Sequence, residues 1–325
     1  MQQRYHLLHL LADGRFHSGE ELGGLLGVGR AAVWKLVQSL APLGLDVYAV
    51  RGKGYQLAEP LELLDRERML VELEPAAAMF LHDLEVIQEI DSTNRYLTER
   101  GRGGAASGHA CFAEYQWAGR GRQGRSWVSP FGSNIYLSVL RRFDVGAEAL
   151  QGLSLATGVA VIRALSSLGI SELKLKWPND VVWRERKLGG ILLETAGEPS
   201  GPWSVVVGVG LNLSLSPLSA HLIDQPWVDL KTIAPARIGR NHIAGRLLSH
   251  LLTALEEFAQ QGFAAFHQEW TRHDLVRDRL VLISSVASAI HGRACGVDPT
   301  GALLLSVEGQ MRRILSGDVS LRVRV

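Results

Sequence analysis

Apolar residues recur with a helical period in the first forty residues of the chain. Over residues 30–40 they fall at the i, i+3, i+4 and i+7 positions of a helix buried along one side, as at Val33 and Val37. An earlier helix is predicted to begin at Ser18, because Ser18 and Glu21 have the spacing of a capping box. Two short helices separated by a glycine-containing turn indicate a helix-turn-helix.

The pattern then changes to alternation. Residues 45–50 alternate like a strand, residues 51–54 form a glycine-containing turn, and residues 55–57 form the second strand of a hairpin. We therefore predict a winged helix-turn-helix over residues 1–60, with its second helix in the major groove of DNA. The predicted DNA-binding residues are Arg30, Trp34, Lys35, Gln38, Arg51 and Lys53. A helical domain used only for protein contacts is the alternative, since the cations of residues 1–60 barely outnumber the anions, and bulky Trp34 is equally compatible with burial.

Residues 61–275 mix strand and helix patterns, which predicts an α+β domain in which a mixed β-sheet carries helices on one face. The predicted strands are residues 83–90, 110–115, 134–140, 173–177, 181–183, 188–194 and 203–213. The predicted helices lie near residues 61–73, 95–100, 150–168, 240–260 and 263–273. Residues 276–325 contain short strands separated by turn residues, which predicts a small C-terminal β-barrel.

Composition adds limits rather than a function. The chain has 325 residues, 46% of them hydrophobic and 21% charged, which is ordinary for a soluble protein. Its net charge of +1 favours neither nucleic acid nor an anionic membrane, so any DNA contact must come from a local patch. We expect no signal peptide, no membrane-spanning segment and a cytoplasmic location. Cys111 and Cys295 are expected to be buried apolar residues, and no histidine spacing predicts a metal ligand set.

The most distinctive stretch is residues 116–138. Arg120, Arg122 and Arg125 alternate with glycines there, before a buried strand begins. Glycine allows close approach of the backbone to a ligand, and arginine binds carboxylate and phosphate groups. This pattern predicts a mobile loop that closes over an anion. An RG-rich nucleic-acid-binding tract is the alternative, but such tracts are usually longer and repetitive.

Short polar residues follow the strand at 83–90, as Asp91-Ser-Thr-Asn94. They are suited either to capping the next helix or to binding a polar head group. Glycines at Gly208 and Gly210 do not complete a dinucleotide-binding fingerprint, because no glycine-rich helix start follows.

Four motifs in this order resemble those of the biotin protein ligases, in particular the bifunctional ligases that also repress the biotin operon. The motifs are residues 119–125 with Trp127 and residues 129–132, then residues 176–180, 187–191 and 208–212. Residues 16–20 and 51–55 also resemble the repressor subfamily, so the resemblance covers essentially the whole chain. It implies a winged helix-turn-helix, a class II synthetase-like ligase domain and an SH3-like β-barrel.

The resemblance also implies a reaction. Such proteins join biotin to ATP, with Mg²⁺ carried by the ATP, and release pyrophosphate. They then pass biotin from biotinyl-5′-AMP to a lysine of the biotin carboxyl carrier protein. Because two anions must meet in the first step, catalysis depends on positioning and on cationic stabilisation. The other implied partners are operator DNA and, once the adenylate is bound, a second copy of the chain in a homodimer.

Site residues follow by matching motif positions. The implied biotin-binding residues are Ser92, Thr93, Asn94, Gln116, Arg120, Gly121, Arg122 and Lys187. The implied nucleotide-binding residues are Arg120, Arg122, Arg125, Trp127, Asn179 and Asn212. Arg122, Lys187 and Asp180 are the expected catalytic residues, with Lys187 on the carboxylate or acyl-phosphate oxygen. Whether Asp180 binds the metal or the acceptor amine, and whether Trp127 stacks on adenine or fills the core, stays open.

Two departures from the family pattern and three alternatives accompany this interpretation. Gln123 replaces a frequent arginine, and Gly29 replaces the usual Ser or Thr cap of the recognition helix. The alternatives are a ligase whose N-terminal domain does not bind DNA, a lipoate ligase, and a regulator with an inactive, biotin-sensing ligase domain.

Overall fold

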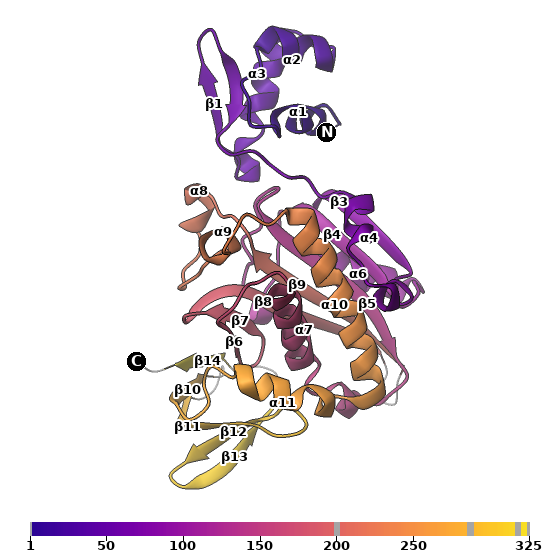
Figure 1. The fold of residues 1–325 in the computed structure, drawn as a ribbon, viewed down its shortest axis with the longest axis vertical. Coiled ribbons are helices and arrows are strands. Elements are labelled where there is room, and N and C mark those ends of the chain that lie inside the picture. Colours follow the sequence, from indigo (N-terminus) through magenta and orange to yellow (C-terminus); the bar gives the residue numbers. More distant parts are fainter. Residues whose placement is uncertain (1, 198–201, 285–288, 316–319, 324–325) are drawn as a thin grey trace.

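The computed structural model describes residues 2–197, 202–284, 289–315 and 320–323. The N-terminal helices and hairpin lie at one end of the molecule, a large sheet with its helices in the middle, and a small sheet at the other end (Figure 1). The N-terminal elements are α1 (Gln2–Leu11), α2 (Gly19–Leu26), α3 (Arg30–Gln38), the 3-10 turn η1 (Ala41–Leu43), β1 (Val47–Val50) and β2 (Gly54–Leu57). These elements confirm the predicted winged helix-turn-helix.

The local signals for this domain behave as predicted. Ser18 Oγ accepts a hydrogen bond from the Glu21 N–H at 3.0 Å, and the Glu21 carboxylate accepts one from the Ser18 N–H at 3.3 Å. Two backbone donors at the start of α2 are thereby satisfied. Val33 and Val37 are buried on α3, whereas Trp34 is 54% exposed. The bulky indole is therefore a surface residue of the recognition helix.

The central sheet has seven strands in the order β3-β4-β5-β9-β8-β7-β6. β3 and β4 are parallel and the other neighbours antiparallel, so the sheet is mixed as predicted. The strands are β3 (Asp83–Ile90), β4 (His109–Gln116), β5 (Asn134–Phe143), β6 (Leu173–Lys176), β7 (Asp180–Trp183), β8 (Arg186–Gly197) and β9 (Trp203–Asn212).

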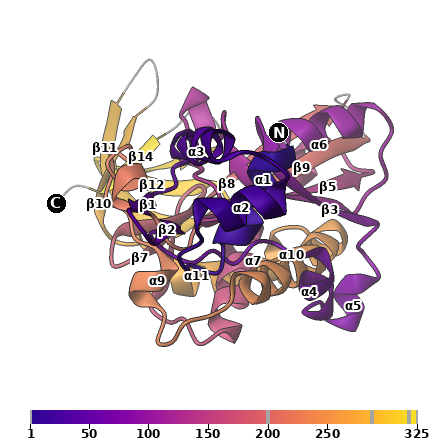
Figure 2. The same ribbon diagram turned by 90° about the horizontal axis from the view of Figure 1, so that it is seen from above.

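Helices cover both faces of this sheet, but unequally (Figure 2). Long helices α7 and α10, with α11, build the main core on one face, as predicted. α6 lies on the opposite face, where its Leu97 packs against Cys111, Leu140 and Val206. The prediction of helices on one face was therefore incomplete, and the rest of the second face is left for a cavity. The helices of this region are α4 (Arg66–Val71), α5 (Pro75–Ala78), α6 (Thr93–Arg102), α7 (Leu153–Ser167), α8 (Pro217–Ala220), α9 (Leu230–Ile233), α10 (Arg240–Gln261) and α11 (Ala264–His273), with 3-10 turns η2 (Arg122–Gly124) and η3 (Ala147–Leu150).

A buried ion pair fixes α10 to the sheet. Arg240 donates to the Glu114 carboxylate at 2.5 Å, and the two side chains are 6% and 4% exposed. Arg240 also donates to the Asn134 carbonyl at 2.8 Å, while the Leu64 N–H donates to Glu114 at 2.5 Å. Buried charges persist in proteins when paired and hydrogen-bonded in this way.

Two expectations from composition need correction. Residues Ala147–Ser167 are long and apolar enough to cross a membrane, contrary to the sequence expectation, although 61% of the window is buried inside the protein. That burial is typical of the core helix of a globular protein. Cys111 is buried as expected, but Cys295 is only half-buried.

The C-terminal strands form an antiparallel sheet in the order β13-β12-β11-β10-β14. The predicted small C-terminal β-module is therefore confirmed, and its closure into a barrel stays a prediction. The indole N–H of Trp177 donates to the Gly301 carbonyl at 3.0 Å, which fastens this sheet to the central domain. The strands are β10 (Leu280–Ser284), β11 (Ala289–Val297), β12 (Leu303–Val307), β13 (Gln310–Ile314) and β14 (Ser320–Val323).

Asp274, between α11 and β10, gives a testable pH dependence. Burial raises its pKa to about 6, even though the Val276 N–H donates to it at 2.9 Å. The folded state therefore holds a proton that the unfolded state has lost, so this carboxyl destabilises the fold as pH rises from about 4 to above 6. We expect Asp274→Asn to gain stability relative to wild type between pH 4 and 7, by at most about 3 kcal/mol.

Thermal unfolding of both proteins from pH 4 to 8 measures this difference. Asp298→Asn is the matched control, and its effect on the stability of the fold should have the opposite sign. Burial opposes ionisation of Asp298, but hydrogen bonds from Thr300 and Arg313 outweigh it and lower its pKa. Parallel pH profiles for wild type and Asp274→Asn would contradict the assignment.

Candidate active site

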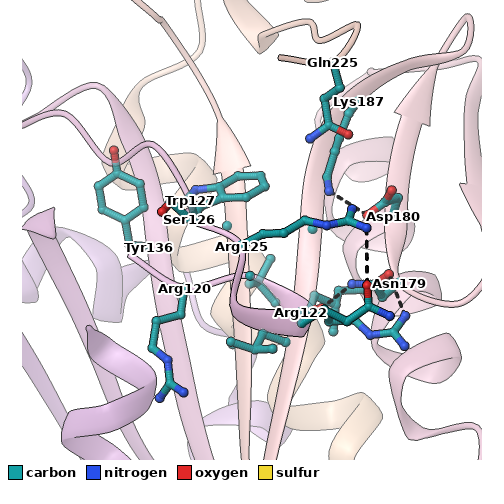
Figure 3. Close-up of a pocket in the computed structure, with 18 of the residues that line it drawn as sticks. Arg120, Arg122, Arg125, Ser126, Trp127, Tyr136, Asn179, Asp180, Lys187 and Gln225 are labelled. Carbon is teal, nitrogen blue, oxygen red and sulfur yellow. Dashed lines mark hydrogen bonds and ion pairs between the residues drawn. The ribbon is translucent and has the colours of Figure 1, made fainter. Parts of the chain in front are cut away.

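A cavity of about 760 Å³ opens on the face of the central sheet that α7 and α10 do not cover (Figure 3). Two glycines of β9, Gly208 and Gly210, form the floor of this cavity. A Cβ atom added to Gly208 would lie 2.1 Å from Asn94 Oδ1, and one added to Gly210 would lie 2.6 Å from the Trp127 ring. Neither contact is sterically possible, so both positions require glycine for the polar and aromatic side chains to lie against the sheet.

One end of the cavity is a buried network of neutral polar side chains. Gln116 Oε1 accepts from the Thr93 N–H at 2.9 Å, and its Nε2 donates to Ser129 Oγ at 3.1 Å. Ser138 Oγ donates to Asn94 Oδ1 at 2.6 Å, and Asn94 Nδ2 donates to a carbonyl of β8 at 3.1 Å. The network is at most 8% exposed. Its donors and acceptors are uncharged, which suits a neutral polar head group.

The two interpretations of residues 91–94 are now distinguishable. Ser92 occupies the cap position of α6 but makes no side-chain capping hydrogen bond. Ser92, Thr93 and Asn94 instead line the cavity, and all are at least 96% buried. The head-group interpretation is therefore the better supported of the two.

The glycine–arginine stretch forms a closed loop over this face. The Gly121 N–H donates to the Arg125 carbonyl at 2.7 Å, and the Trp127 N–H donates to the Gly119 carbonyl at 2.9 Å. Gln123 has a φ of 57° in the left-handed region, where a side chain costs about 1 kcal/mol. This strained residue stands at the position where the family resemblance predicts arginine.

Positive side chains converge on the other end of the cavity (Figure 3). Lys187 Nζ lies 2.8 Å from Asp180 Oδ1, with both side chains under 20% exposed. Arg122 Nη1 donates to Asn179 Oδ1 at 3.3 Å, and Arg125 also lines this region. The structure therefore brings together the predicted catalytic residues and most of the predicted anion-binding residues.

Arg120 points away from this group. Its guanidinium donates to Glu194 Oε1 at 2.7 Å, on β8. Arg120 lines the cavity, and its ion pair with Glu194 fastens the loop to the sheet. The predicted contacts of Arg120 with biotin and with the nucleotide stay predictions.

Trp127 is half-buried, with one face over the glycine floor. Lys187 Nζ lies 5.5 Å from the ring centroid, within range of a cation–π contact. Its buried indole N–H has no hydrogen-bond partner within the described residues. An indole with an unused donor beside the cationic end fits contact with a ligand better than core packing.

Asn212 does not line the cavity. Its amide donates to the Val228 carbonyl at 3.2 Å and to the Lys187 carbonyl at 3.4 Å, so it supports the backbone of Lys187 from below. This position fits a structural role, and the predicted nucleotide contact of Asn212 stays a prediction.

Three functional positions escaped the sequence interpretation. Ser138 and Ser129 belong to the polar network, and Glu194 holds the loop. Strand alternation contained a signal for Ser138, because it faces the same side of the sheet as Tyr136, which also lines the cavity. Burial raises the pKa of Tyr136, which stays a neutral phenol and donates to the Pro130 carbonyl at 2.8 Å.

A second candidate surface lies on the winged helix-turn-helix. The six predicted DNA-binding residues are all exposed: Arg30, Trp34, Lys35, Gln38, Arg51 and Lys53. Lys53, at the wing tip, also lies 5.7 Å from the ring centroid of Phe16. The recognition helix and wing thus present cations where phosphate contacts are expected.

Comparisons with known proteins agree with this site. Residues 86–212 match the model of the Biotin/lipoate A/B protein ligase family, residues 3–56 that of an HTH domain, and residues 287–322 that of the Biotin protein ligase C terminal domain. The bifunctional ligase/repressor BirA of Escherichia coli is 42% identical over 97% of this chain and 96% of its own.

The biotin–[acetyl-CoA-carboxylase] ligase of Mycobacterium tuberculosis is 36% identical over 81% of this chain and 97% of its own. A solved structure of Aquifex aeolicus biotin protein ligase with biotin and ATP superimposes with a TM-score of 0.64 at 28% identity, covering 75% of this chain and all of that one.

Fold, site and relatives define this chain as a biotin protein ligase that carries an N-terminal helix-turn-helix. It belongs to the family of bifunctional biotin ligase/repressors.

The glycine floor yields a prediction. Gly208→Ala forces Asn94 away from its bonds to Ser138 and β8, so we expect the KM for biotin to rise more than tenfold. Gly24→Ala, on α2 with open space around its Cβ, is the matched control and should leave KM unchanged. Biotin-dependent exchange of pyrophosphate into ATP measures both. An unchanged KM in Gly208→Ala would show that the network does not bind biotin.

Proposed function

We propose that the cavity binds biotin and ATP side by side, joins them as biotinyl-5′-AMP, and passes biotin to a lysine of a biotin carboxyl carrier protein. The observation that carries the proposal is the division of the cavity into a neutral polar end and a cationic end. Biotin combines an uncharged ureido head group with a carboxylate, so each part has matching chemistry.

At the polar end, Thr93, Asn94 and Gln116 would bind the head group by hydrogen bonds that are already oriented. At the cationic end, Arg122 and Lys187 would hold the carboxylate against the α-phosphate of ATP. As the carboxylate oxygen attacks, negative charge grows on the phosphate. Fixed cations in a partly buried site stabilise that charge without reorganising.

Mg²⁺ would enter with ATP. Asn179 and Asp180 supply an amide and a carboxylate oxygen at the cationic end, and oxygen donors are what Mg²⁺ prefers. Bound there, Mg²⁺ would neutralise phosphate charge. Asp180 is alternatively placed to accept the proton of the acceptor lysine in the second step, once Lys187 has turned to the acyl-phosphate.

Arg125 and Trp127 would border the nucleotide, with adenine against the exposed face of the indole. The loop of residues 117–127 would then shield the adenylate from water, which otherwise hydrolyses a mixed anhydride. In this scheme Arg120 and Gly121 act through loop closure, the first by its ion pair with Glu194.

The decisive measurement is biotin-dependent exchange of labelled pyrophosphate into ATP with Mg²⁺, and lipoate as the control acid. We expect exchange with biotin only. Lys187→Met should lower the exchange rate by about 10²- to 10³-fold, because a preorganised charge at the reacting group is lost. Arg184→Met, an exposed hairpin arginine, is the matched control and should keep the wild-type rate.

No exchange with either acid would instead support a biotin-sensing regulator with an inactive ligase domain. A normal rate in Lys187→Met would contradict the role given to that residue while leaving the ligase activity in place.

We further propose that the chain binds operator DNA as an adenylate-dependent homodimer and represses biotin-synthesis genes. Support comes from a ligase-domain residue inside the winged helix-turn-helix. The Phe131 side chain is 2% exposed in the hydrophobic core of the N-terminal domain, where its ring stacks on Tyr5 at 6.1 Å. Its N–H donates to the Leu43 carbonyl at 2.9 Å.

Phe131 lies two residues after Ser129, which bonds to Gln116 in the polar network. A short, covalently continuous segment thus connects the biotin end of the cavity to the DNA-binding domain. A ligand at one site can change the affinity of the other site only if it interacts differently with two states of the protein. The effect on the two affinities must then be reciprocal. A ligase with an inert N-terminal domain would not need this connection.

We expect Phe131→Ala to weaken biotin-dependent DNA binding at least tenfold. Removing a buried ring costs about 3–5 kcal/mol of local packing and frees the segment from the N-terminal domain. Binding to promoter DNA of biotin-synthesis genes, with and without biotin plus ATP, measures the effect. Phe143→Ala removes a ring of equal burial from the ligase core and is the control for general destabilisation.

Operator binding that is the same with and without biotin and ATP would contradict the repressor proposal. We propose domain boundaries after residues 60 and 275. Because the proposed substrates and carrier protein are cytoplasmic, we propose that location, without a membrane partner.

A further inference from the structure

We propose that Asp83, Glu85 and His109 form a binding site for a divalent transition metal of the Zn²⁺ class. The three residues lie at the start of β3 and β4, at the opposite end of these strands from the polar network of the cavity. The eight residues of β3 place the two sites about 20 Å apart. The proposed site is therefore separate from the catalytic cavity and from any Mg²⁺ that ATP carries.

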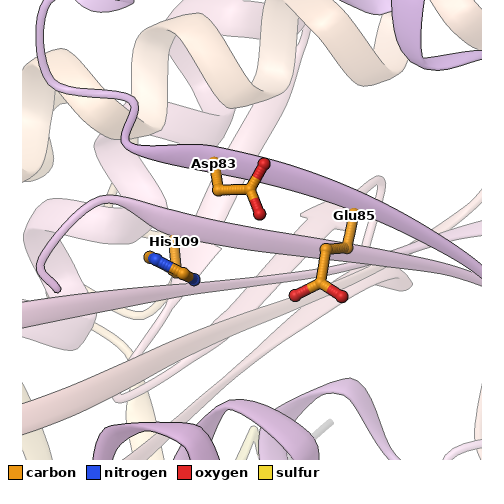
Figure 4. Close-up of side chains that lie close together, drawn as sticks. All are labelled: Asp83, Glu85 and His109. Carbon is orange, nitrogen blue, oxygen red and sulfur yellow. The ribbon is translucent and has the colours of Figure 1, made fainter. Parts of the chain in front are cut away.

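Strand register brings the three side chains together. β3 and β4 run parallel with Asp83 opposite His109 and Glu85 opposite Cys111. Because side chains alternate between the faces of a sheet, Asp83, Glu85 and His109 share one face. One ligand atom from each lies within 4.8 Å of the other two, and Figure 4 shows the three side chains gathered on the two neighbouring strands.

Unused buried donors and acceptors point to a ligand at this position. Within the described residues, nine buried side-chain polar atoms have no hydrogen-bond partner, and two of them are Glu85 Oε1 and His109 Nδ1. His109 is only 8% exposed. An unpartnered polar atom away from water costs free energy, and a bound cation would satisfy both atoms at once.

The neighbours of the site leave Glu85 Oε1 and one oxygen of Asp83 available, while Asp83 Oδ1 accepts a hydrogen bond from the Leu84 N–H at 2.8 Å. Arg100 lies 3.8 Å from Glu85 Oε1 and Arg66 lies 3.8 Å from Asp83, both beyond hydrogen-bond distance. These cations balance the two carboxylates without using all of their lone pairs. A bound metal would have to displace the two arginines or share the carboxylates with them, which predicts a modest affinity for the metal.

A second group of contacts orients the ligands. The Tyr96 hydroxyl donates to Glu85 Oε2 at 2.8 Å, which directs the other oxygen into the site. The ring of His82 stacks on the ring of His109, with 4.8 Å between their centroids, which helps to fix the orientation of the imidazole.

The donor set selects the metal. One imidazole and two carboxylates suit Zn²⁺, Co²⁺ or Ni²⁺, whereas Mg²⁺ and Ca²⁺ prefer oxygen ligands alone. Since β3 is the edge strand of the sheet, a metal shared between β3 and β4 would stabilise that edge. Binding to the folded state alone raises the melting temperature.

The test uses metal-free, full-length protein titrated with Co²⁺, followed by its visible absorption, and then with Zn²⁺ as competitor. We expect one equivalent to bind with micromolar affinity and to raise the melting temperature. Glu85→Gln and His109→Gln should each weaken binding at least tenfold. Asp83→Asn alters the most exposed ligand and keeps the test usable if a buried substitution unfolds the chain.

His17→Gln is the matched control. His17 also lies between two carboxylates, with its ring nitrogens 3.0 Å from Asp13 and 3.3 Å from Glu21, but those pairs are already hydrogen-bonded. The His17→Gln variant should bind Co²⁺ with the same affinity as the wild type. Absence of binding, or equal losses in His17→Gln and the site variants, would overturn the proposal and leave adventitious binding only.

Discussion

The lack of a side chain at the glycines Gly208 and Gly210 is the constraint on which the rest of the site depends. Each sits at a position of β9 where a Cβ atom would overlap Asn94 or Trp127. Because the backbone is bare there, a carboxamide and an indole lie directly on the sheet. Asn94 is then within reach of Ser138, and the polar end of the cavity is assembled from buried groups that satisfy one another.

The same constraint explains how the catalytic cleft is connected to the two accessory domains. The segment that brings Trp127 onto the glycine floor continues to Phe131, whose ring belongs to the core of the winged helix-turn-helix. At the other end of the cleft, the residues before Asn179 are held by Trp177, which is bonded to the C-terminal sheet. Contacts outside the ligase domain thus help to hold both ends of the cleft.

Local patterns predicted much of this structure, and non-local pairings account for what they missed. The capping box at Ser18 and the buried stripe of α3 depend on neighbours a few residues away, so sequence was sufficient. Arg120 pairs with Glu194, which lies 74 positions later in the sequence. The parallel register that places His109 beside Asp83 likewise has no local sequence signal. Motif resemblance located the cavity residues, but it left open whether Asn212 borders the nucleotide or supports the site, because a motif does not show whether a side chain faces the cavity.

The cations of the cavity are held by partners that substrates can replace. Lys187 is paired with Asp180 and Arg122 with Asn179, so both charges are positioned before any anion arrives. Such partly buried pairs contribute little net stability, because the Coulombic gain is offset by lost hydration. In the proposed reaction, a carboxylate and a triphosphate would compete with these partners for the two cations. Asp180, released from Lys187, would then be available for the metal or for the acceptor amine, so one exchange of partners would connect the two proposed half-reactions.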